Sequence, residues 1–223
     1  MRKQSDKRRG AEAGFTLIEL MVALAVTLAI MVVATRMLAM SLAVRARENQ
    51  RAEAVADVQR ALQTMSREIS NAGLGMSPVN GNPNNGLVNA DSDNLSIRVR
   101  SNLDAFCGPN GGACDSDTSD PDEDVVFSLI SNNSGGETQK LIVRQDVTTG
   151  GISPLANRVD ALGFSYLKAD GTPAATPSAA SRVRMVVTVD LLAIGTPGKP
   201  GYQPATRTRL TSDAVLRNTL LGQ

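Results

Sequence analysis

Residues 15–35 read FTLIELMVALAVTLAIMVVAT, and Glu19 is the only charged residue in this stretch. The stretch has about the 20 apolar residues that a helix needs to cross the hydrocarbon core of a bilayer. Five basic residues precede it: Arg2, Lys3, Lys7, Arg8 and Arg9. Because basic residues beside a membrane span stay in the cytoplasm, we expect residues 1–14 there and the rest of the chain on the other side.

Two ordinary interpretations of this segment explain it incompletely. A cleaved secretory signal has a shorter apolar core and a small-x-small cleavage site, whereas this run is longer and continues into Ala34-Thr35-Arg36-Met37. A plain membrane anchor explains the length but not Glu19. A carboxylate inside a membrane costs on the order of 2.5–3.5 kcal/mol, so Glu19 is a candidate functional residue.

Residues 14–26, GFTLIELMVALAV, resemble the signature of type IV prepilins. The resemblance implies that a prepilin peptidase cuts the chain between Gly14 and Phe15 and N-methylates the new amino terminus at Phe15. Glu19 then becomes the family's glutamate near the mature amino terminus, with a role in assembly. Its burial becomes less costly when the terminal ammonium of a neighbouring subunit pairs with it.

A helical pattern continues beyond the apolar run. Apolar residues recur at steps of three and four, at Val55, Val58, Leu62, Met65 and Ile69, with charged and polar residues between them. There is no proline before Pro78, and Gly73 is a natural stop. We therefore predict one helix over residues 15–72, about 87 Å long. Residues 15–36 form its membrane-embedded half, and residues 37–72 form its amphipathic half.

Residues 73–223 are predicted to form a β-rich globular domain in the periplasm, after a loop at 73–94. The expected strands are Leu95–Arg100, Val125–Ile130, Lys140–Gln145, Val159–Leu167, Arg182–Ile194 and a segment near Thr206–Leu216. Alternating segments such as LSIRVR suit a sheet with one buried face. The predicted fold class is α+β, with a long N-terminal helix packed on a mostly antiparallel sheet, as in pilins.

The composition removes several chemistries. The chain has no histidine, so Ser-His-Asp catalysis, Cys-His catalysis and histidine-based zinc sites are excluded. The formal net charge of +1 argues against nucleic acid as the main partner. We therefore expect neither an enzyme nor a cofactor.

The two cysteines, Cys107 and Cys114, flank the short loop GPNGGA. A loop rich in glycine and proline brings two sulfurs together easily, which favours a local disulfide. Such a bond persists in an oxidising compartment such as the periplasm. Two free thiols are the alternative.

An acidic stretch follows the second cysteine. Its aspartates could supply oxygen ligands to calcium: Asp115, Asp117, Asp120, Asp122 and Asp124. The start resembles an EF-hand loop, but Asp120 and Val126 stand where that loop needs glycine and glutamate, so an EF-hand is rejected. We expect a solvated acidic loop without a metal, and calcium binding is the alternative.

Three segments narrow the resemblance to the minor pilin PilW and minor pseudopilin J family. Residues 159–171, VDALGFSYLKADG, resemble a strand of that family with aromatic residues before an acidic turn. Residues 67–73, REISNAG, resemble its helix exit, and residues 214–218, AVLRN, resemble its C-terminal segment.

The resemblance implies a minor type IV pilin that helps to initiate or cap pilus assembly through helix packing. The implied partners are prepilin peptidase, other minor pilins or pseudopilins, the major pilin and the inner-membrane assembly platform. The implied location is the bacterial inner membrane, crossed once, and then a fibre. A pseudopilin of a type II secretion system is the alternative within the family. A membrane-anchored binding protein and a DNA-uptake pilus component also remain open.

Overall fold

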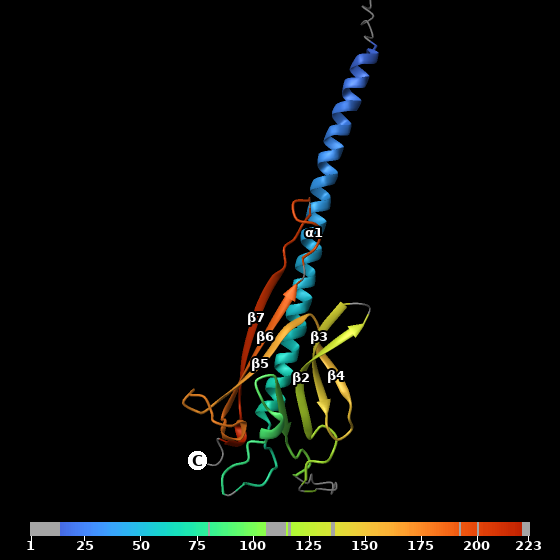
Figure 1. The fold of residues 1–223 in the computed structure, drawn as a ribbon. Helices are drawn as coiled ribbons and strands as arrows, with labels where there is room; N and C mark the ends of the chain where they lie inside the picture. Colours follow the sequence, from blue (N-terminus) through green and yellow to red (C-terminus); the bar gives the residue numbers. More distant parts are fainter. Residues whose placement is uncertain are drawn as a thin grey trace, which may run out of the picture.

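A computed structural model describes residues 14–79, 81–105, 115, 117–134, 137–191, 193–199 and 201–219. One helix, α1, runs from Leu17 to Ser70 and dominates the shape of the molecule (Figure 1). Its 54 residues span about 81 Å at 1.5 Å per residue. The helix is therefore two residues shorter at each end than the predicted 15–72.

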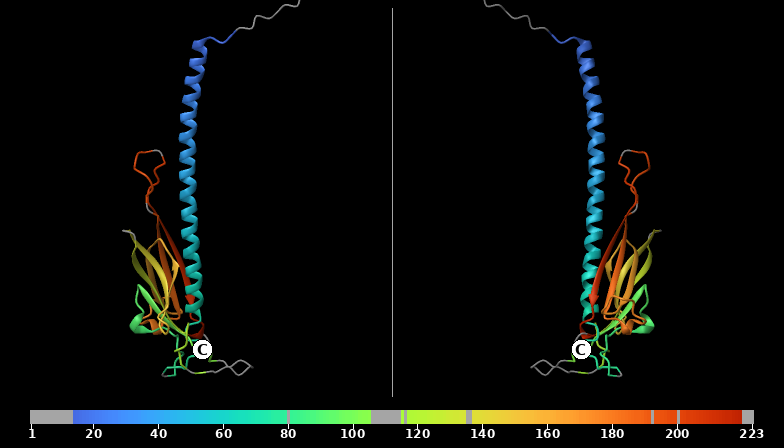
Figure 2. Two further views of the ribbon diagram at one scale, coloured as in Figure 1. Left: turned by 90° about the vertical axis from the view of Figure 1, so that its right-hand side faces the viewer. Right: turned by 90° about the vertical axis from the view of Figure 1, so that its left-hand side faces the viewer.

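The two halves of α1 lie in different environments. The first half projects beyond the rest of the protein, and the sheets lie on one side of the second half (Figure 2). The buried apolar residues of α1 are Ala54, Val58, Ala61, Leu62, Met65 and Ile69. Their spacing confirms the predicted stripe, although Ala54 rather than Val55 occupies its first fully buried position.

The first sheet contains four antiparallel strands in the order β1-β2-β3-β4. Their bounds are Ser96–Arg100, Asp124–Ser134, Glu137–Asp146 and Ile152–Ala156. Strand β4 was not among the predicted strands, and it contains Pro154. The structure places β4 at the edge of the sheet, where the missing N–H of a proline is tolerated.

The second sheet contains three antiparallel strands in the order β5-β6-β7. Their bounds are Val159–Leu167, Arg182–Leu191 and Thr206–Val215. Three short 3₁₀ helices complete the described elements: η1 (Asn89–Asp91), η2 (Pro177–Ala179) and η3 (Arg217–Thr219). The α+β class with a long N-terminal helix on antiparallel strands is confirmed, and the strands divide into two sheets.

One apolar core joins the helix to both sheets. Phe127 and Ile142 contribute to it from the first sheet, Leu162 and Val187 from the second, and Met65 from α1. Strands β4, β6 and β7 contact the helix, and β5 contacts strands of the first sheet. The two sheets therefore share a core on the same stretch of α1, as Figure 1 shows.

Polar contacts also connect the elements. The hydroxyl of Tyr166 in β5 donates to the carbonyl oxygens of Asp93, at 2.9 Å, and Ser96, at 3.2 Å, which lie at the start of β1. Burial raises the pKa of this phenol. The buried guanidinium of Arg47 donates to the carbonyl oxygens of Leu191 and Pro204, both at 2.9 Å. Arg47 thereby ties α1 to the segment between β6 and β7, close to where the helix leaves the domain.

At the exit of α1, four chain segments lie close together. Gly73 has a φ of 77°, and its N–H donates to the carbonyl of Arg100 at 2.8 Å. The side-chain amide of Asn218, near the C-terminal end of the described chain, donates to the carbonyls of Gly73 and Asn84 at 2.8 and 2.6 Å. A Cβ at Gly73 would overlap the carbonyl of Asn84. Glycine is therefore required for both its φ and its lack of a side chain.

We expect Gly73→Ala to lower the unfolding free energy of the domain more than Gly171→Ala does. Gly171 has a similar φ of 85° but has no atom within 4 Å of an added Cβ. Gly171→Ala, the control, should lower the unfolding free energy by about 1 kcal/mol from backbone strain alone. Gly73→Ala should lower it by at least about 2 kcal/mol, because the steric overlap adds to the strain. Denaturant unfolding of the full chain in detergent measures both, and equal losses would contradict the packing argument.

Candidate functional site

The predicted processing site lies just before the first turn of α1. Gly14 precedes the helix, and no atom lies within 4 Å of a Cβ added to it. The side chain of Phe15 is 83% exposed. No described segment covers the backbone of Gly14 and Phe15, so a protease could reach the bond between them.

Thr16 and Glu19 form the start of the helix together. Thr16 has an extended backbone, with φ −75° and ψ 149°, and its hydroxyl oxygen accepts the N–H of Glu19 at 3.3 Å. The same hydroxyl donates to the Glu19 carboxylate at 3.5 Å. This arrangement resembles a capping box, in which a threonine and a glutamate three residues later satisfy the free groups of the first turn.

The local role of Glu19 is too weak to explain its place in the apolar run. A helix cap contributes about 1 kcal/mol. A carboxylate near the positive end of the helix dipole contributes about 0.3–1 kcal/mol more. Their sum is below the roughly 2.5–3.5 kcal/mol that a carboxylate costs at the centre of a membrane helix. A further partner is needed if this turn becomes buried in an apolar environment.

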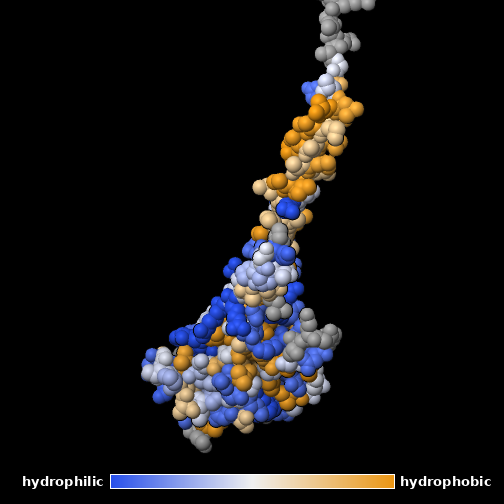
Figure 3. All heavy atoms as spheres, turned by 45° about the horizontal axis from the view of Figure 1, so that its top comes forward, coloured by the Kyte–Doolittle hydropathy of each residue, from blue (hydrophilic) through white to orange (hydrophobic). Residues whose placement is uncertain are grey.

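The first half of α1 presents an apolar surface on every side. Its large apolar side chains, from Leu17 to Val44, are exposed, and Figure 3 shows a mostly hydrophobic column with a few hydrophilic interruptions. In the described part of the chain, α1 is the one helix long and apolar enough to cross a membrane. Exposed apolar surfaces of this extent mark contact with lipid or with other proteins.

Comparison with known proteins identifies the same segment. A family model of the prokaryotic N-terminal methylation motif matches residues 9–35, which include Gly14, Phe15 and Glu19. No curated protein and no solved structure matches the chain. The motif supports a type IV pilin-like protein, a pilin or a pseudopilin. It also implies processing by prepilin peptidase, assembly with pilus components in general, and anchoring in a membrane through the apolar helix.

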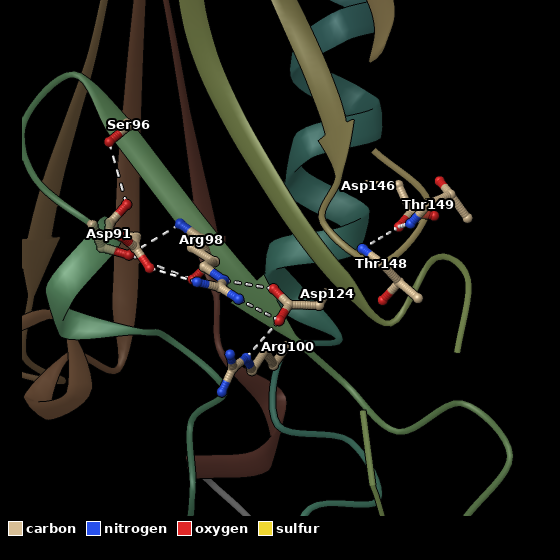
Figure 4. Close-up of polar contacts among 9 residues, drawn as sticks. Asp91, Ser96, Arg98, Arg100, Asp124, Asp146, Thr148 and Thr149 are labelled. Atoms are coloured by element: carbon tan, nitrogen blue, oxygen red, sulfur yellow. Dashed lines mark hydrogen bonds and ion pairs between the residues drawn. The ribbon is translucent and has the colours of Figure 1, made fainter. Parts of the chain in front are cut away.

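The structure separates the five acidic residues that were candidates for calcium. The carboxylate of Asp124 accepts from Arg98 through two hydrogen bonds of 2.7 Å and from Arg100 at 2.8 Å (Figure 4). Asp122 pairs with Arg144 at 2.8 Å. Asp124 and Asp122 are thus neutralised by arginines and are poor candidates for metal ligands.

The other three aspartates lie outside these ion pairs. Asp117 accepts the N–H of Ser119 at 2.8 Å. Asp115 and Asp120 lie close to Asp104, which was not predicted as a member of the group. Asp104 is distant in sequence from the acidic stretch, so only the tertiary fold brings it there. Cys107 and Cys114, the predicted disulfide pair, lie outside the described residues.

The environment of Asp124 sets its acidity. Burial by itself would raise the pKa of this carboxyl, but the hydrogen bonds and charges of Arg98 and Arg100 outweigh burial and lower the pKa below 3.8. A lowered pKa stabilises the folded state above the unfolded-state value, and this contribution is lost as the pH falls through the folded-state value. The cluster of Asp124 with Arg98 and Arg100, called the Asp124 cluster below, therefore stabilises the start of β2 at neutral pH.

We expect Asp124→Asn to lower the unfolding free energy by about 1–3 kcal/mol at neutral pH, because two arginines lose a buried, charged acceptor. The deficit relative to the unmodified chain should shrink as the pH falls below 3.8 and the native aspartate is protonated. Denaturant unfolding across this pH range measures it.

Asp213→Asn is the matched control. Asp213 also accepts two hydrogen bonds from one arginine, Arg184, but this pair is exposed. Exposed pairs contribute about 1 kcal/mol or less. A loss for Asp124→Asn as small as that of the control at neutral pH would contradict the structural role of the Asp124 cluster.

Proposed function

We propose that the chain is a minor type IV pilin of the PilW type, made as a single-pass inner-membrane precursor with its β-rich domain in the periplasm. Its role is structural, not enzymatic. The observation that carries the proposal is α1 itself. One continuous helix anchors its second half in a folded domain and leaves an apolar first half uncovered, and this half begins at the N-terminal methylation motif.

The proposed mechanism is association through the exposed half of α1. Prepilin peptidase cuts between Gly14 and Phe15, which frees a positively charged amino terminus at Phe15. The Glu19 carboxylate is held in the first helical turn by Thr16, and a carboxylate has acceptor positions beyond the one that Thr16 uses. The terminal ammonium of a neighbouring subunit can therefore pair with Glu19 while the apolar helices pack side by side.

Three segments support the minor-pilin assignment over a generic pilin. The helix exit and the C-terminal segment meet in space, because Asn218 donates to the carbonyl of Gly73. Strand β5 carries Phe164 into the core and Tyr166 to the junction of the two sheets. These are the segments that resemble PilW and pseudopilin J. The predicted partners are other minor pilins, the major pilin and the assembly platform.

The first experiment measures the mature amino terminus. We expect the chain from cells with prepilin peptidase to begin at N-methylated Phe15, and the chain from cells without the peptidase to keep residues 1–14. Intact-mass and N-terminal peptide analysis distinguish the two forms. Residues 1–14 retained in both strains would overturn the proposal and would favour a membrane-anchored binding protein.

The second experiment tests charge pairing at Glu19. Glu19→Gln keeps the side-chain size and removes the charge, so we expect at least an approximately tenfold lower amount in purified fibres, since a hydrogen bond to a charged group contributes about 1.5–3 kcal/mol. Thr16→Ala is the control, because it removes the cap and keeps the charge. Both amounts are normalised to processed chain. Fibre incorporation of Glu19→Gln equal to that of the unmodified chain would contradict charge pairing.

The alternative role as a pseudopilin predicts a different phenotype. Deletion of the gene should reduce surface pili if the chain is a minor pilin. It should instead leave pili intact and block the release of secreted proteins if the chain serves a type II secretion system.

A further inference from the structure

Three carboxylates converge in the loop region between β1 and β2. Asp104 follows β1, and Asp115 and Asp120 precede β2. One carboxylate oxygen from each residue lies within 4.8 Å of those from the other two. Two oxygen ligands of one calcium ion, each at about 2.4 Å, can be at most about 4.8 Å apart. The spacing of the three carboxylates therefore suits a shared calcium ion.

Buried polar atoms without a partner border this cluster. Glu123 is 2% exposed, and one of its carboxylate oxygens accepts the N–H of Leu103 at 2.5 Å while the other, Oε2, has no hydrogen-bond partner among the described residues. Asn102 is 1% exposed, and its amide donates to the carbonyl of Asp115 at 3.2 Å while no described residue forms a hydrogen bond with its Oδ1. Oδ1 of Asp104 is also buried, and the described part of the chain offers it no partner.

These unpartnered atoms are all oxygens, and their residues lie beside the three aspartates. Asn102 contacts Asp115, and Glu123 contacts the residue before Asp104. A buried acceptor without a partner costs about 1–3 kcal/mol, so three in one region are unusual in a native fold. A cation bound at the cluster would be a partner for Asp104 and would place a positive charge near Asn102 and Glu123.

The negative charge of this region also favours the binding of a cation. Among the described residues, the cluster aspartates and Glu123 form no ion pair with lysine or arginine, whereas Asp91, Asp122 and Asp124 are paired with arginines. The cluster therefore repels itself when no cation is present.

We propose that Asp104, Asp115 and Asp120 bind one calcium ion, beside the buried and unpartnered oxygens of Glu123 and Asn102. The donors are carboxylates, with no nitrogen or sulfur ligand, which excludes a typical zinc site. Calcium accepts six to eight oxygens in irregular arrangements, whereas magnesium requires a tight octahedron and retains several waters. The donor set therefore favours calcium.

The ion would join the two ends of the connection between β1 and β2. Asp104 lies on the chain that leaves β1, and Asp115 and Asp120 lie on the chain that enters β2. The described part of this connection lies at the end of the domain opposite the apolar half of α1, as Figure 1 shows. Calcium binding would fix this outer surface and stabilise the folded domain by mass action.

The experiment titrates CaCl₂ into the full chain in detergent after removal of metals with a chelator. Isothermal calorimetry measures binding, and thermal unfolding measures stability. We expect a single site and an increase in Tm that grows with calcium concentration, while MgCl₂ at the same ionic strength gives a clearly smaller increase.

Two substitutions locate the site. Asp120→Asn should weaken calcium binding at least about tenfold, because it removes a charged ligand. Asp117→Asn is the matched control in the same loop. It removes the same charge, but the Asp117 carboxylate accepts the backbone of Ser119 and lies outside the cluster. This control should change the affinity less than about threefold.

Three results would overturn the proposal: no heat and no Tm shift at millimolar calcium, equal shifts with calcium and magnesium, or equal weakening by Asp120→Asn and Asp117→Asn. The last two would mean that cations only screen a negative loop. None of these results depends on processing at Gly14 or on assembly, so the test is independent of the proposed function.

Discussion

Burial of the stripe from Ala54 to Ile69 on α1 is the interaction on which the rest of the structure depends. Both sheets place their apolar faces on this stretch, and Val58, Met65 and Ile69 have no exposed surface. Each large apolar side chain buried in this way contributes about 1.5–3 kcal/mol. The sheets are connected to each other chiefly through this shared core, so the helix is part of the domain and not an appendage to it.

This packing fixes what the first half of α1 can do. Since the helix is continuous and its second half is held by both sheets, the apolar half must project from the domain (Figure 2). No described segment folds back to cover it. Arg47, which bonds to two carbonyl oxygens of the domain, is the first buried residue of α1, so it marks the point where the sheets begin to cover the helix. Lipid first, and then neighbouring helices, are the apolar surroundings that fit such a surface.

The sequence predicted the parts of the structure that are encoded locally. The apolar run, the stripe of α1, the stop at Gly73 and six of the strands all follow from short-range patterns of residues. The N-terminal motif was also recognisable in the sequence, because its residues are neighbours in the chain, and a family model matches residues 9–35. The capping contact between Thr16 and Glu19 was missed, although its spacing is visible in the sequence.

The features that were missed depend on contacts between distant residues. The division of the strands into two sheets depends on which strands pair, and alternation within one strand carries no such information. Strand β4 was not predicted, and its Pro154 is compatible with a strand because β4 lies at the edge of the sheet. The grouping of Asp104 with Asp115 and Asp120 required the ends of β1 and β2 to be neighbours.

The central claim is that the exposed half of α1 packs against the helices of other subunits. Photo-crosslinking in intact cells tests it most directly, with a photoreactive amino acid at Leu28 and, as a control, at Leu95 on the surface of the domain; both positions are exposed. The account predicts that the probe at Leu28 joins the chain to other pilin-like subunits only when prepilin peptidase is present. A processed chain whose Leu28 probe captures lipid but no protein, under conditions in which fibres form, would contradict it.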